Sequence, residues 1–95
     1  MSELFWSIEA RADLRRIDDW LSSNASNGII TRTFMQIGGR STLLLDYLLS
    51  GPRVKDGQRS LRVTGTPYML VYRPRRAGIE ILRIRHIRQD WQPPE

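Results

Sequence analysis

Apolar residues in the first half of the chain recur every three or four positions, which is the spacing of one helix face. They form two runs, Ala10, Leu14, Ile17 and Leu21, and then Ile30, Phe34, Ile37, Ser41, Leu44 and Leu48. Ser7 is a suitable N-cap for the first helix, and the polar segment 22–28 ends it. The second helix is predicted from about Ile29 to Leu49. Two helices joined by a short polar loop form an antiparallel hairpin.

Two adjacent glycines, Gly38 and Gly39, interrupt the second predicted helix. Each costs about 1 kcal/mol relative to alanine in a helix interior. Close approach of a neighbouring helix would explain them, and a kink is the other possibility. Neither glycine begins a phosphate-binding loop, because no Lys-Ser or Lys-Thr follows.

The second half of the chain changes to strand-like patterns after the turn signal at 50–52. Three strands are predicted, at 59–63, 68–73 and 79–86, with hairpin loops at 64–67 and 74–78. Leu4 and Trp6 alternate with other residues in a short first strand. The order β-α-α-β-β-β predicts one α+β domain over 1–95, an antiparallel sheet packed on one face by the helix hairpin. The tail 89–95 is expected to be extended.

Alternation along the last strand predicts which side chains face the helices. Leu82 and Ile84 are expected in the core, whereas Arg83 and Arg85 point to the open face of the sheet, together with Ile79 and Ile81. Arg59 and Arg62 lie on opposite faces of their strand, so at most one of them shares that open face. Asp13 and Arg16, three residues apart, are expected to form an ion pair on the helix surface.

The charge is uneven along the 95 residues. Fifteen basic residues, all but one of them arginine, oppose ten acidic residues, for a net charge of +5. Residues 1–50 carry −1 and residues 51–95 carry +6. A guanidinium grips a carboxylate or a phosphate in two places, so the partner expected is nucleic acid or an acidic protein. A solvated arginine surface is the alternative for each single arginine.

Several kinds of chemistry are excluded by composition. The chain has no cysteine and one histidine, His86, so it has no disulfide, no cysteine-ligated metal and no multi-histidine site. We expect no cofactor. No apolar run approaches the roughly 20 residues that span a bilayer, and the N-terminus does not look like a secretion signal, so a cytoplasmic protein without a membrane partner is expected.

The ordered set of segments from Leu4 to about Trp91 resembles the ParE branch of the RelE/ParE toxin superfamily. The segments are 10–17, Gly51-Pro52-Arg53-Val54, Arg59-Ser60-Leu61-Arg62-Val63, 67–73 and 81–88. The resemblance implies the toxin of a type II toxin–antitoxin pair, in a hetero-oligomer with a ParD-like antitoxin whose C-terminal segment wraps the toxin. RelE-like members cut mRNA in the ribosomal A site, whereas ParE-like members poison DNA gyrase and block replication.

Departures from the nuclease pattern favour the gyrase branch. Met69 stands where nuclease members usually carry an arginine, and Trp91 roughly replaces a terminal tyrosine. The usual lysines before the second strand are replaced by Gln58, Arg59 and Ser60. The His86 and Arg88 spacing is instead typical of ParE-like toxins. We therefore expect a non-enzymatic gyrase inhibitor, with a RelE-like mRNA endonuclease as the alternative.

The candidate target-binding residues are Arg59, Arg83, Arg85, His86, Arg88 and Trp91. A hydrogen-bonded role at the strand end is preferred for His86 over that of general base, and an interface anchor is preferred for Trp91 over packing at the sheet edge. Trp20 is expected to cover the core edge and Tyr68 to pack on the sheet. Direct contact with nucleic acid, the gyrase subunit involved and the stoichiometry stay open.

Overall fold

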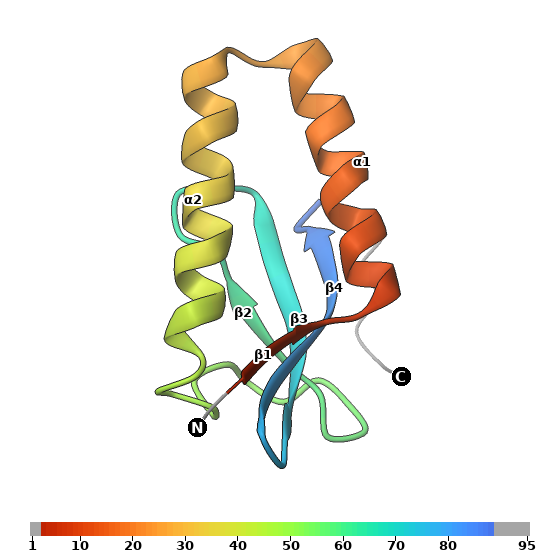
Figure 1. The fold of residues 1–95 in the computed structure, drawn as a ribbon, viewed down its shortest axis with the longest axis vertical. Coiled ribbons are helices and arrows are strands. Elements are labelled where there is room, and N and C mark those ends of the chain that lie inside the picture. The colour runs from red at the N-terminus through yellow and green to blue at the C-terminus, as the bar shows by residue number, and fades with distance from the viewer. Residues whose placement is uncertain (1–2, 89–95) are drawn as a thin grey trace.

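The computed structural model describes residues 3–88, and its elements follow the predicted order β-α-α-β-β-β (Figure 1). They are β1 (Glu3–Trp6), α1 (Ile8–Asn24), α2 (Asn27–Leu43), β2 (Arg59–Arg62), β3 (Tyr68–Arg75) and β4 (Gly78–His86). The predicted extension of the tail 89–95 lies outside the described residues.

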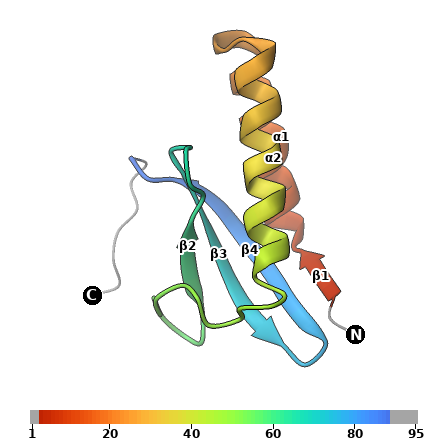
Figure 2. The same ribbon diagram turned by 90° about the vertical axis from the view of Figure 1, so that its left-hand side faces the viewer.

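The strands form one sheet in the order β1-β4-β3-β2, and both helices cover the same face of it (Figure 2). Two neighbouring pairs are antiparallel, as expected for strands joined by short loops. β1 pairs with β4 in parallel, with Glu3 opposite Gly78 and Trp6 opposite Ile81. The α+β prediction is therefore confirmed, but the sheet is mixed, because no short hairpin loop joins β1 to its neighbour β4 and forces the pair to be antiparallel.

The predicted helix faces form the core together with the inner face of the sheet. Ala10, Ile17 and Leu21 of α1 and Ile37 of α2 are buried, and Leu14, Ile30 and Phe34 pack against them. The sheet contributes Leu61, Leu70, Tyr72, Ile79, Ile81 and Ile84. Periodicity thus predicted correctly which side of each helix meets the sheet.

α2 ends at Leu43, six residues before the predicted end at Leu49. Leu44 still reaches the core, but Leu49 is 65% exposed, because the chain turns away to reach β2. Gly51 fixes that path. A Cβ atom there would lie 1.9 Å from the carbonyl oxygen of Ser60, and its N–H donates to the hydroxyl of Tyr72 at 2.9 Å.

Gly38 and Gly39 do not mark a contact between helices within this chain. Both lie inside α2, and no atom comes within 4 Å of where either Cβ would stand. Gly39 is exposed, and Gly38 is half-buried at the edge of the stripe formed by the buried residues Thr33, Ile37 and Ser41. The prediction that a neighbouring helix approaches closely here is therefore wrong for the described residues.

A β-bulge in β4 corrects the predicted assignment of its faces. Tyr72 pairs with Ile81 but Val71 pairs with Arg83, so Leu82 is an extra residue without a partner on β3. The insertion reverses the alternation, and Ile79, Ile81 and Ile84 all lie in the core while Leu82 does not. The prediction that Ile79 and Ile81 share the open face with Arg85 is wrong for this reason.

Candidate functional site: the groove between helix α1 and strand β4

A groove of about 1,100 Å³ lies between the second half of α1 and the C-terminal end of β4. Four arginines line it (Arg16, Arg83, Arg85 and Arg88), together with His86 and two aromatic residues, Trp20 and Tyr68. Figure 2 shows the helix hairpin and the sheet separating toward that end of the fold. The groove therefore combines most of the predicted target-binding residues in one place.

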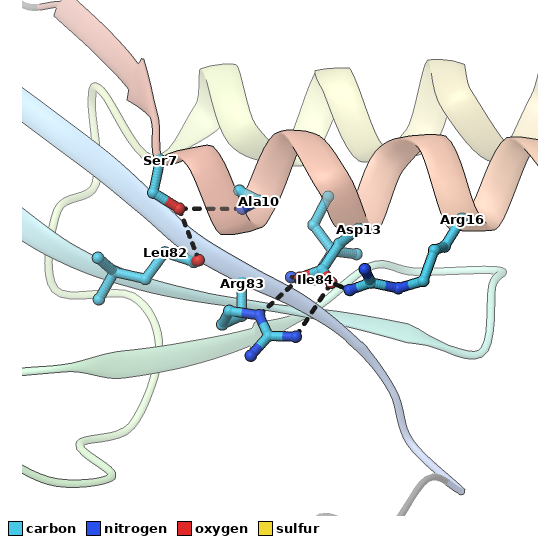
Figure 3. Close-up of polar contacts among 7 residues, drawn as sticks. All are labelled: Ser7, Ala10, Asp13, Arg16, Leu82, Arg83 and Ile84. Atoms are coloured by element: carbon cyan, nitrogen blue, oxygen red, sulfur yellow. Dashed lines mark hydrogen bonds and ion pairs between the residues drawn. The ribbon is translucent and has the colours of Figure 1, made fainter.

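The start of α1 replaces β1 as the neighbour of β4 (Figure 3). The N–H of Ser7 donates to the carbonyl of Ile81 at 3.0 Å, and its hydroxyl donates to the carbonyl of Leu82 at 2.8 Å. The same hydroxyl accepts the N–H of Ala10 at 3.0 Å, so Ser7 is the N-cap that the sequence predicts. One serine thereby begins the helix and joins it to the strand.

Asp13 continues this junction nearly two turns further along α1 (Figure 3). Its Oδ2 accepts the backbone N–H of Ile84 at 2.9 Å. Arg83 binds both carboxylate oxygens, Nε to Oδ2 at 2.8 Å and a terminal nitrogen to Oδ1 at 3.1 Å, and Arg16 binds Oδ1 as well. The carboxylate is 4% exposed, so it is a buried anion held by two cations and an amide.

The pairing sets the protonation of both partners. Burial alone would raise the pKa of Asp13, but the hydrogen bonds from Arg83 and Ile84 and the charges of Arg83 and Arg16 outweigh it and lower that pKa. The hydrogen bond to Asp13 likewise raises the pKa of Arg83. The predicted pair of Asp13 with Arg16 exists, but it is not a surface pair, because the carboxylate faces β4. Ile84 is in the core, so Arg83 leaves β4 on the predicted side, but its guanidinium is tied to Asp13 of α1.

His86 and Tyr68 form the floor of the groove at the end of the sheet. The two rings meet edge to face, with centroids 5.5 Å apart. Nδ1 of His86 accepts the backbone N–H of Arg88 at 3.0 Å, which places the proton of the neutral ring on Nε2. Burial raises the pKa of the Tyr68 hydroxyl, so it keeps its proton at neutral pH. The hydrogen-bonded role predicted for His86 at the strand end is present.

Arg59 and Trp91 are not brought to the groove by the described structure. Arg59 lies on β2, at the opposite side of the sheet from α1, and donates to the carbonyl of Gly51 at 2.8 Å. Trp91 lies outside the described residues. The groove therefore contains Arg83, Arg85, His86 and Arg88 of the six predicted residues.

The family model for the ParE toxin of the parDE type II toxin–antitoxin system matches residues 4–91. The chain belongs to the ParE toxin family. A solved structure of the chromosomal ParDE toxin–antitoxin system from P. aeruginosa matches at 26% identity and a TM-score of 0.78, covering 90% of this chain and 96% of that one. The E. coli DinJ–YafQ complex matches in fold, at 14% identity and a TM-score of 0.61, over 97% of this chain and 100% of that one. No curated protein matches.

In this ParE-family toxin, sequence reasoning missed several groove residues, among them Asp13, Trp20 and Tyr68. Trp20 is 59% exposed and lines the groove, so it does not cover the core edge as predicted. Its position three residues after Ile17, beside the buried stripe, was the available signal. Among residues 3–88 no cluster of ligands suits a metal ion, and no helix is long and apolar enough to cross a membrane.

Proposed function

We propose that this ParE-family toxin inhibits DNA gyrase and so blocks replication, acting in the cytoplasm by binding rather than by catalysis. The observation that carries the proposal is the groove, whose lining combines four arginines with the aromatic residues Trp20 and Tyr68. The buried acidic residue of this lining, Asp13, is already paired with Arg83 and Arg16. Aromatic and arginine side chains are the residues that most often anchor protein interfaces. The partner surface that fits is acidic, with an apolar side chain that contacts these rings.

Asp13 and Tyr68 are poorly suited to the proton transfers of phosphodiester cleavage, and Nδ1 of His86 is occupied by the backbone N–H of Arg88. General acid–base catalysis needs a group that exchanges a proton near neutral pH. Asp13 has a lowered pKa and both of its oxygens are occupied, while Tyr68 has a raised pKa. Met69, at the position of the usual nuclease arginine, can neither donate a proton nor stabilise a developing charge.

We also propose that a ParD-like antitoxin neutralises the toxin in a hetero-oligomeric complex. Family membership supports this, as does the likeness to the P. aeruginosa ParDE system. An antitoxin that binds only the folded toxin also stabilises it by mass action. That contribution matters for a 95-residue domain with a small core.

The test adds the antitoxin-free toxin to gyrase with supercoiled plasmid, and in parallel to translating ribosomes. Accumulation of linear plasmid is expected, with intact mRNA. The variant R85Q/R88Q should lose the linear product, because both cations line the groove. The control R15Q/R32Q removes the same charge from exposed helix positions and should keep it. Cleavage of A-site mRNA with unaffected gyrase would overturn the proposal in favour of a RelE-like endonuclease.

A further inference from the structure

The face of the sheet that points away from the helices carries rows of arginine. Core residues fix which side chains lie there, because neighbours along a strand alternate between faces. Leu61, Leu70 and Ile84 are in the core, so the adjacent cross-strand row, Arg62, Met69 and Arg85, lies on the open face. Figure 2 shows this face on the side opposite both helices.

The same alternation places two further arginines of β3 on the open face. Tyr72 and Ile81 are in the core, so Arg73 and its partner Glu80 lie on the open face, joined by an ion pair of 3.0 Å. Arg75 follows two residues later, and its guanidinium stands 4.5 Å above the ring of Phe5. Both arginines can still bind a further anion, because a guanidinium has five N–H donors and neither contact occupies all of them.

Among residues 3–88, charge on this face is predominantly positive. Arginines from three strands (Arg62, Arg73, Arg75 and Arg85) stand against Glu80 and, by alternation from Phe5, Glu3 at the sheet edge. Strands lie about 4.8 Å apart and rise about 3.3 Å per residue, so the four cations cover an area of roughly 10 by 20 Å. B-DNA carries one phosphate charge per about 1.7 Å of its axis, or about 12 over that length.

The apolar residues distinguish this face from the groove. The large exposed hydrophobic side chains among residues 3–88 all belong to the helices or to segment 43–49, and none lies on a strand. A protein interface needs large exposed apolar or aromatic anchors at its centre, whereas the apolar side chains that alternation places in the middle of this face, Met69 and Val71, are half-buried and buried respectively. A single nucleic-acid strand needs exposed rings for base stacking, whereas Phe5 is covered by Arg75.

We propose that the open face of the sheet binds the phosphate backbone of double-stranded DNA, independently of base sequence. The four arginines of this face, Arg62, Arg73, Arg75 and Arg85, supply the contacts. This surface is separate from the groove except at Arg85, which belongs to both. The inference does not rest on gyrase inhibition, because the DNA contact belongs to the toxin alone.

The experiment measures binding of the antitoxin-free toxin to fluorescent 20-base-pair DNA duplexes of two unrelated sequences, without gyrase, at several salt concentrations. Four phosphate contacts predict a slope of log K against log salt near −3.6 and roughly 100-fold weaker binding at 200 mM than at 50 mM salt. Both sequences should bind alike. The variant R62Q/R73Q should bring the slope to about −1.8.

The control R15Q/R32Q has the same net charge as R62Q/R73Q but changes exposed residues of the two helices. Its slope should equal that of the wild type. Equal slopes for the two double variants would show that only net charge matters and would overturn the proposal, as would undetectable binding. Tighter binding to an RNA duplex than to DNA would overturn the assignment to DNA. A toxin that binds DNA in this way but leaves gyrase active would contradict only the proposed function.

Discussion

The carboxylate of Asp13 is the contact whose removal should damage this fold most selectively. Asp13→Ala deletes the acceptor of the Ile84 amide and the partner of Arg83. Breaking a fully buried ion pair costs about 3–5 kcal/mol, but the side chain of Arg83 is 35% exposed and regains water. The orphaned amide adds about 1–3 kcal/mol. We expect a total loss of about 2–4 kcal/mol in the free energy of unfolding.

For a domain of this size each 1 kcal/mol shifts Tm by about 4–8 °C, so Asp13→Ala should melt about 10–25 °C lower. Circular dichroism of the antitoxin-free toxin during heating and urea titration measures both quantities. Asp13→Asn should lose less, because the amide oxygen still accepts from Ile84. Asp18→Ala, on the exposed side of the same helix, should change stability by less than about 0.5 kcal/mol. Equal losses for Asp13→Ala and Asp18→Ala would refute the reasoning.

Three further predictions concern stability. Because the pKa of Asp13 is lowered by folding, its contribution to the free energy of unfolding is complete above the ordinary carboxyl pKa of about 3.9 and is lost as the pH falls through the lower folded value. Below about pH 4, the urea midpoint of the wild type should therefore fall more steeply with acidification than that of Asp13→Asn. Gly38→Ala and Gly39→Ala should each raise the free energy of unfolding by roughly 0.5–1 kcal/mol, because space is open around both, and a fall in Tm would contradict this. Tyr72→Phe should lower stability by about 1–3 kcal/mol in urea titration, since the buried N–H of Gly51 loses its acceptor, and an unchanged midpoint would argue against that hydrogen bond.

Local periodicity was enough to predict the elements and the buried helix faces, because those depend on residues three or four positions apart. The end of α2 was predicted too late, because Leu44 and Leu48 continue the apolar spacing while the chain already turns toward β2. The bulge at Leu82 was also hidden, because apolar residues occupy both alternating sets of positions in segment 79–86 and do not show where the alternation changes.

The candidate site depends on contacts that sequence spacing does not contain. Asp13 has an arginine three residues away, which describes an ordinary surface pair, but its decisive partner Arg83 is 70 residues distant. The basic residues near the end of β4 could be listed from the sequence, whereas their position opposite Trp20 follows from the packing of α1 on that strand. The gyrase target stays a prediction from the family resemblance.

The bond from Ser7 to Leu82 spans 75 residues of sequence, which has a consequence for the time course of synthesis. At 5–20 residues per second, the ribosome needs about 4–15 s to make the segment between them. During that interval the edge contacts of α1 with β4 cannot form, and the groove lacks Arg83, Arg85, His86 and Arg88. The groove on which the proposed function depends is therefore completed only when translation is nearly finished, so under that proposal the toxin would gain its target-binding surface at about the time it is released.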